Sequence, residues 1–143
     1  GGESEVMENQ LRHIVTRLTD EGLVIELFDL PDVPLFEPGT DTPTPVLKEL
    51  AALIAAVAAS VTNEVALAGH VRANPVVQAD IPVWQLSADR ADSLRGLLKD
   101  SGLRPDREQR VTGHADREPV SRDPMAKRNN RVEIILLRDD AAQ

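Results

Sequence analysis

The chain has 143 residues, about the length of one domain, and it contains no cysteine, which excludes disulfide bonds and cysteine-ligated metal ions. A formal net charge of −8 and a total of two Phe, one Trp and no Tyr argue against a nucleic-acid partner, because a polyanion is repelled and its bases find few rings to stack on. The longest apolar run, over residues 50–61, is shorter than the roughly 20 residues that a membrane-spanning helix requires.

The first segment of the chain predicts a helix. Within residues 5–18 the apolar side chains follow a helical spacing: Leu11, Ile14, Val15 and Leu18. The chain begins with two glycines and has neither an initiator Met nor a signal peptide, so we expect the natural chain to extend upstream. We therefore interpret residues 1–18 as a linker or an N-terminal helix.

The next part of the chain predicts one strand and one helix, joined by a long loop. Residues 23–29 are rich in branched side chains, which is typical of a strand, whereas residues 30–45 contain five prolines. Thr44 and Pro45 form a favourable helix start, with Thr as the N-terminal cap and Pro in the first turn. Apolar side chains then recur at steps of three and four, which predicts one buried stripe: Leu47, Leu50, Ile54, Val57 and Val61.

The remaining sequence predicts three strands and a second helix. Residues 64–70 alternate as a strand, and a loop over residues 71–85 leads to a helix that we expect to be capped by Ser87 and closed by Gly102. Residues 109–114 indicate a weaker strand. The last strand, residues 131–138, has an apolar core that favours a central position in the sheet.

These elements predict an α/β two-layer sandwich with helices on one face of a mixed sheet. Their order is strand, helix, strand, helix, strand, loop, strand. The two helical crossovers indicate parallel pairing of the first three strands, and the final strand would close the sheet in the antiparallel sense.

The clearest candidate binding residue is Arg90, which is expected about three residues into the second helix. A cation in the first turn opposes the helix dipole, so it requires an anion nearby, and the free amides at a helix start also bind anions. Two interpretations follow: Arg90 binds an external carboxylate, or it forms an internal salt bridge. A second candidate anion surface is the segment 104–131, which carries 8 basic and 5 acidic residues.

The sequence predicts neither a metal site nor a catalytic site. His70, His114 and Asp116 supply the residue types of a zinc site, but their spacing matches no metalloenzyme motif. Ser87, His70 and Asp89 supply the residue types of a catalytic triad, but no Gly-x-Ser-x-Gly turn is present. We expect no metal, no cofactor and no enzymatic activity.

Four blocks of the sequence carry a family resemblance. They are Gly69-His70, the run Trp-Gln-Leu-Ser-Ala-Asp-Arg-Ala at 84–91, the segment 113–119, and Asn-Asn-Arg-Val-Glu-Ile at 129–134. They resemble the motifs Gly-His-Thr-Asp, Leu-Ser-x-x-Arg-Ala and Asn-Arg-Arg-Val-Glu-Ile of the OmpA-like peptidoglycan-binding domain, and within that family the MotB-type stator subunits of the flagellar motor. The resemblance covers roughly residues 19–138 and leaves residues 139–143 as a tail.

The resemblance implies an OmpA-like β-α-β-α-β-β fold and a peptidoglycan-binding site. Arg90 matches the family arginine that holds the carboxylate of diaminopimelate in the stem peptide. The whole set carried over is Arg90, His70, Arg72, Leu86, Ser87 and Arg131. Two positions depart from the family pattern: Arg72 replaces the Asp that accepts from the ligand's ammonium group, and Val83 replaces an Asn. Neither side chain accepts a hydrogen bond.

As a function, the resemblance implies a non-catalytic domain that anchors a flagellar motor stator to the cell wall. It would be the periplasmic part of a protein held in the inner membrane by a segment absent from this sequence. The implied partners are the peptidoglycan stem peptide, a second copy of the chain as a homodimer, and the stator A subunit. Two alternatives stay open, another OmpA-like cell-wall tether, or a degenerate dimerisation or docking scaffold that has lost the ligand.

Overall fold

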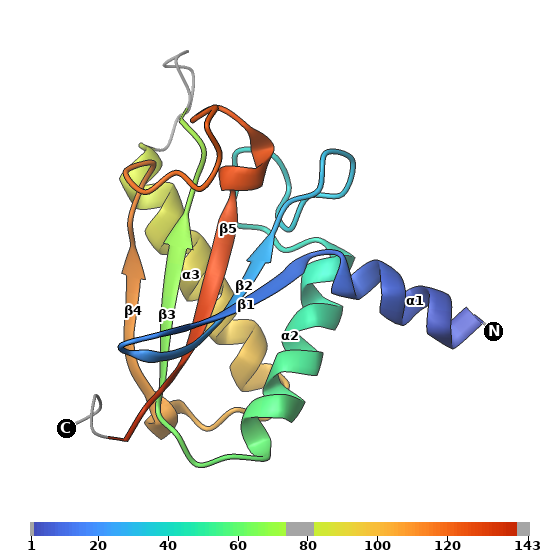
Figure 1. The fold of residues 1–143 in the computed structure, drawn as a ribbon, viewed down its shortest axis with the longest axis vertical. Helices are drawn as coiled ribbons and strands as arrows, with labels where there is room; N and C mark the ends of the chain where they lie inside the picture. The colour runs from blue at the N-terminus through green and yellow to red at the C-terminus, as the bar shows by residue number, and fades with distance from the viewer. Residues whose placement is uncertain (1, 74–81, 140–143) are drawn as a thin grey trace.

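The computed structural model describes residues 2–73 and 82–139, which form one five-stranded sheet with helices on one face (Figure 1). The strand order is β1-β2-β5-β3-β4. The elements in chain order are α1 (Gly2–Leu11), β1 (Ile14–Thr19), β2 (Gly22–Phe28), α2 (Pro45–Ala59), β3 (Val65–His70), α3 (Val83–Asp100), β4 (Glu108–Gly113) and β5 (Arg131–Leu137). Short 3-10 helices occupy Pro105–Arg107 and Lys127–Asn129.

The α/β two-layer sandwich predicted from the sequence is confirmed, and β5 is its central strand. β5 pairs antiparallel with β2 and with β3, whereas β3 pairs parallel with β4. The expected parallel pairing of three successive strands is therefore wrong in one respect: β2 and β3 run in the same direction, but β5 lies between them. β5 has apolar residues on both of its faces, Val132 and Ile134 on one and Ile135 and Leu137 on the other, so it suits this enclosed place.

The helix expected over residues 5–18 is also wrong in its second half. The helix α1 ends at Leu11, and residues 14–19 form β1, which pairs antiparallel with β2. Thr19 pairs with Gly22 across a two-residue turn, and Gly22 has a φ of +144°. A residue with a side chain rarely adopts that φ, so the glycine fixes this hairpin. The sheet therefore begins before the domain boundary expected at residue 19.

The main core lies between the sheet and the two long helices. In Figure 1 both α2 and α3 lie behind the sheet. Leu47, Leu50 and Ile54 of α2 are buried as expected, but Val57 and Val61 are 44% and 37% exposed, respectively. The buried stripe instead includes small residues that were not counted as apolar anchors: Ala51, Ala55 and Ala58. Val61 lies beyond the end of the helix at Ala59, and Val57 lies at the edge of the stripe set by the helical repeat of 3.6 residues.

The start of α3 differs from the prediction, and the difference matters for Arg90. The helix begins at Val83 after Pro82, so Ser87 lies inside it and caps nothing. Arg90 then lies in the third turn, beyond the reach of the helix dipole, and that part of the argument for an anion is wrong. The helix ends near Gly102 as expected, since Gly102 has a φ of +109°. Residues 74–81 of the expected loop lie outside the described residues.

Among the residues described, no helix combines the length and the apolar character needed to cross a membrane.

Candidate functional site

A groove lies beside the C-terminal end of β2, between the loop of residues 30–44 and the first half of α3. It encloses a cavity of about 170 Å³, and its walls are largely apolar, from Pro31, Pro34, Phe36, Val83 and Leu86. Its charged lining residues are Asp29, Arg72, Arg90 and Lys127. We call this the Arg90 groove. Three cations and one acid give its described lining a positive balance, which favours an anionic ligand.

The guanidinium of Arg90 is buried and contacts no carboxylate of the described residues. The residue is 6% exposed, its Nε donates to the carbonyl oxygen of Thr40 at 2.8 Å, and its guanidinium lies over the ring of Phe36, 4.9 Å from the ring centroid. Within the described ranges, no carboxylate oxygen lies within 4.0 Å of it. Burial lowers the pKa of Arg90, against the opposing charges of Asp29 and Asp41. An arginine always remains charged, so this one favours an acid group from outside.

Asp29, the one acid among the described lining residues, is occupied by neutral donors. Asp29 Oδ1 accepts from the backbone N–H of Leu35 at 2.8 Å, and Oδ2 accepts from the side chain of Asn130 at 3.1 Å. Burial raises the pKa of Asp29, in spite of these two hydrogen bonds. Asp29 therefore holds the loop and Asn130 in place and does not pair directly with Arg90.

The same hydrogen bonds position the second cation of the groove. Asn130 Oδ1 accepts from the backbone N–H of Arg72 at 2.8 Å, and the Arg72 side chain donates to the carbonyl oxygen of Met125 at 3.3 Å. Lys127 donates to the carbonyl oxygen of Pro31 at 3.1 Å. Both cations donate only to neutral carbonyl oxygens of the described chain, so their charge is not neutralised there.

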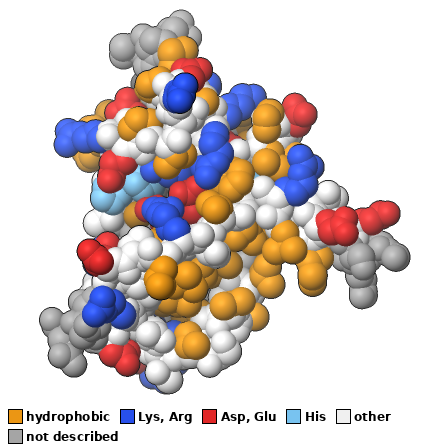
Figure 2. All heavy atoms as spheres, viewed as in Figure 1, with side chains coloured by type: hydrophobic (Ala, Val, Ile, Leu, Met, Phe, Trp, Pro, Cys, Tyr) orange, Lys and Arg blue, Asp and Glu red, His pale blue; other side chains and the backbone are white. Residues whose placement is uncertain are grey.

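The face of the sheet opposite the helices carries a second set of charges. Glu26 is 1% exposed, and its carboxylate contacts Arg17 at 3.0 Å, Arg128 at 2.5 Å and Arg131 at 3.5 Å. Glu133 accepts from Arg17 at 2.5 Å and from His70 Nε2 at 2.9 Å. We call these side chains the sheet-face network. Figure 2 shows charged side chains beside a histidine on this face, above a hydrophobic patch.

Burial and hydrogen bonding oppose one another at Glu133. Burial alone would raise its pKa, but hydrogen bonds from His70 and Arg17, together with the charge of Arg17, outweigh it and lower the pKa to about 2. Each acid of the network therefore has cationic or N–H partners within the protein. In this network each of the three arginines lies within 4.0 Å of a carboxylate of the described chain, unlike Arg90.

Known proteins with a similar sequence or fold include members of the family that the sequence blocks resemble. No protein-family model matches the chain. Motility protein B of Escherichia coli strain K12 is 32% identical over 134 residues, which cover 92% of this chain and 44% of that protein. The periplasmic domain of Helicobacter pylori MotB has a TM-score of 0.76 at 21% identity, covering 88% of this chain and 82% of that one. The resemblance to MotB is confirmed.

A cell-wall anchor gives a further structural match. The anchor of the T6SS from Pseudomonas aeruginosa has a TM-score of 0.72 at 22% identity and covers 94% of this chain and 96% of that one. The chain spans less than half of the length of the E. coli motility protein B that it matches. The fold is therefore that of the MotB periplasmic domain, and the activity of a whole motility protein is a matter for proposal.

The MotB-like motif residues divide between the two faces of the sheet. Arg72, Leu86 and Arg90 line the groove, as does Val83 at the position where the family has Asn. His70 and Arg131 lie on the opposite face: His70 bonds to Glu133, and Arg131 lies against Glu26.

Ser87 has a packing role in the described chain. It is fully buried, and its Oγ donates to the carbonyl oxygen of Trp84 and accepts from the backbone N–H of Ala115, each at 2.9 Å. Its backbone lies so close to Gly69 that a Cβ built there would approach the Ser87 carbonyl oxygen to 2.1 Å. The Gly-His and Leu-Ser motifs thus meet where α3 lies on β3, and this contact holds Arg90 beside the groove.

Sequence reasoning missed several residues that shape the groove, namely Asp29, Phe36, Lys127 and Asn130. Lys127 and Asn130 belong to the basic segment 104–131, which was noted as a surface but not placed next to Arg90. The proline-rich loop also carried a sequence signal, its aromatic residue Phe36. In the structure the ring of Phe36 lies against the Arg90 guanidinium.

Proposed function

We propose that this domain binds the peptidoglycan stem peptide and anchors a MotB-like stator to the cell wall. The observation that carries the proposal is Arg90, a buried guanidinium in a positive groove with no carboxylate within 4.0 Å in the described chain. The names of its relatives and structural neighbours, motility protein B and a cell-wall anchor, support the same role.

The groove geometry suits a carboxylate held by a fork of two hydrogen bonds. Thr40 and Phe36 fix Arg90 through its Nε and its flat face, so its terminal N–H groups are the donors left for a ligand. A planar guanidinium matches a carboxylate with two parallel bonds, and burial strengthens both. Binding is passive and involves no chemical step: the wall holds the domain, and the domain holds the stator.

Arg72 changes which charged groups of a ligand the groove can bind. Where the family has an Asp for the ligand's ammonium group, Arg72 adds a second cation to the groove. A zwitterionic diaminopimelate end would keep its carboxylate partner and lose its amine partner. We propose either weaker wall binding or a preference for a stem peptide with different decoration.

The first experiment is co-sedimentation with purified sacculi. The wild-type domain is expected in the pellet, and Arg90→Ala and Arg90→Lys are expected largely in the supernatant, because a lysine cannot form the two-bond fork. Arg95→Ala is the matched control, since Arg95 is half exposed on the same helix and pairs with Asp92. If the wild-type domain stays in the supernatant, the scaffold alternative is favoured instead.

A second variant tests the departure from the family. Arg72→Asp restores the family residue and is expected to increase sedimentation with sacculi that contain diaminopimelate. Unchanged sedimentation would place position 72 outside the site.

The proposal extends to the setting of the domain. We propose a periplasmic location, with the inner-membrane segment, a homodimer and the stator A subunit supplied by the rest of a MotB-like protein. This chain spans 44% of motility protein B, so these partners are proposed for the whole protein rather than for this chain alone.

A further inference from the structure

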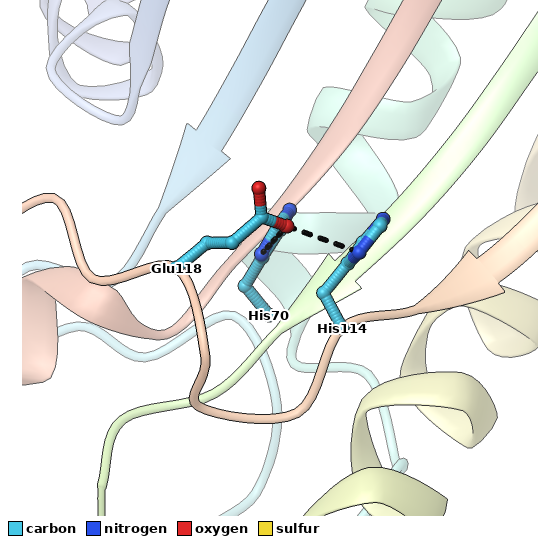
Figure 3. A group of neighbouring side chains, drawn as sticks. All are labelled: His70, His114 and Glu118. Carbon is cyan, nitrogen blue, oxygen red and sulfur yellow. Dashed lines mark ion pairs between the residues drawn. The ribbon is translucent and has the colours of Figure 1, made fainter.

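Two imidazole rings and a carboxylate meet at the end of β3 and β4, on the sheet face opposite the Arg90 groove (Figure 3). The rings of His70 and His114 are stacked, with centroids 4.7 Å apart and planes within 10°. Glu118 Oε2 lies 3.0 Å from His114 Nδ1 and 4.0 Å from His70 Nδ1. Asp116, which the sequence paired with these histidines, is not in this group.

His70 is the fixed member of this group. It is 4% exposed, and its Nε2 lies 2.9 Å from Glu133 Oε1, which Arg17 also holds. Because Glu133 accepts, this hydrogen bond assigns the imidazole proton to Nε2 and leaves a lone pair on Nδ1. Nδ1 is buried and has no hydrogen-bond partner in the described chain. A buried acceptor without a donor is costly, so an electrophilic partner at this atom would stabilise the protein.

We propose that His70 Nδ1, His114 Nδ1 and the Glu118 carboxylate bind one divalent transition-metal ion, with zinc the best fit. Two imidazole nitrogens and one carboxylate form a ligand set that suits zinc, whereas magnesium and calcium prefer oxygen alone. Glu133 holds His70 from behind, as acids do for metal-bound histidines. Nothing in the proposed wall-binding role requires this ion.

The spacing of the donor atoms is compatible with one ion after a small closure. All candidate atoms lie within 4.8 Å of one another, and a tetrahedral zinc site places its ligand atoms about 3.4 Å apart. Glu118 is 58% exposed and lies on the segment after β4, so it can supply the movement. His114, Glu118 and Glu133 also line a separate cavity on this face, which gives an ion a route in and leaves room for a water as fourth ligand.

A bound ion would join three parts of the chain, β3, the end of β4 and the segment that leads to β5. That segment continues to Pro124, whose carbonyl oxygen accepts from Ala73, and to Met125, whose carbonyl oxygen accepts from Arg72. The expected physical effect is therefore a stabilised fold with this segment held more firmly against β3.

The test is zinc titration of the full chain, without a histidine tag, by calorimetry and by thermal unfolding. We expect one zinc per chain and a higher unfolding temperature with zinc. His114→Ala and Glu118→Gln change exposed or half-exposed ligands, so they should fold, and each is expected to weaken zinc affinity about tenfold or more.

Asp116→Asn is the matched control, because Asp116 lies between the two ligands in sequence but outside the group, and it should bind zinc as the wild type does. Cobalt gives a second readout, since its visible spectrum reports nitrogen and oxygen ligation in a tetrahedral site. Absence of zinc binding, or affinities unchanged in both ligand variants, would overturn the proposal.

Discussion

The two faces of the sheet treat buried arginine in opposite ways. In the sheet-face network, Arg131 is 5% exposed and lies against Glu26, an acid that Arg17 and Arg128 also contact. In the Arg90 groove, the equally buried Arg90 has a carbonyl oxygen and an aromatic ring as neighbours, and Asp29 is bound by neutral donors. A buried arginine whose acid is supplied internally is structural, and one whose acid is not supplied is a candidate binding residue.

The two buried acids Asp29 and Glu133 show the same contrast. Burial raises the pKa of Asp29, whereas hydrogen bonds from His70 and Arg17 lower the pKa of Glu133 to about 2 against the effect of burial. The His70 hydrogen bond and the contacting Arg17 cation therefore favour the charge of Glu133. The charge of Asp29 has weaker support, because Arg90 acts on it without direct contact and burial outweighs that effect.

The largest expected effect comes from breaking the sheet-face network at Glu26. Glu26→Gln leaves the buried Arg131 and the partly exposed Arg17 and Arg128 opposite a neutral amide, so we expect the free energy of unfolding to fall by about 3 kcal/mol, the lower end for broken buried ion pairs. Urea denaturation measures the change. Asp92→Asn is the control, since it removes an exposed pair with Arg95 and should cost no more than about 0.5 kcal/mol. A similarly small loss for Glu26→Gln would mean that the network does not stabilise the fold.

Acid should weaken the same network, whereas protonation of Asp29 in the groove should not destabilise the fold. The folded pKa of Glu133 lies below its ordinary value of 4.5, so its contribution to stability is present above pH 4.5 and is lost as the pH falls toward about 2. The shift at Asp29 has the opposite sign, since a raised pKa makes protonation favour the folded state.

Urea midpoints measured across this pH range, without added metal, provide the test. Glu133→Gln should flatten the loss of stability on acidification, because the group whose pKa differs between the folded and unfolded states is then absent. An equally steep loss in this variant would assign the acid sensitivity to other carboxylates.

Much of the fold could be predicted from the sequence because its strongest signals are local. The central place of β5 followed from its apolar residues, and the end of α3 from Gly102. The strand β1 was missed because Ile14 and Leu18 are spaced by four, which suits one face of a helix and one face of a strand equally. The interposition of β5 between β2 and β3 depends on long-range pairing, which no local pattern reports.

The site was only partly predictable, for a related reason. The motifs identified Arg90 and Leu86, but which face of the sheet each residue occupies is a tertiary property. His70 belongs to the same strand end as Arg72, yet its side chain lies in the sheet-face network and Arg72 lines the groove. Likewise, the choice of Glu118 over Asp116 depends on how the segment after β4 turns, where Ala115 has a φ of +55°.

The smallest expected effect provides the sharpest test of the comparison. Asp29→Asn removes one negative charge from a buried site, as Glu26→Gln does, but Asp29 accepts from neutral N–H groups and burial already disfavours its charge. We expect the free energy of unfolding to change by about 1 kcal/mol or less. The groove also becomes more positive, so sedimentation with sacculi should be unchanged or modestly increased. If this variant costs as much as Glu26→Gln, Asp29 is the counter-ion of Arg90 at longer range, and the groove is a second internal network rather than a binding site.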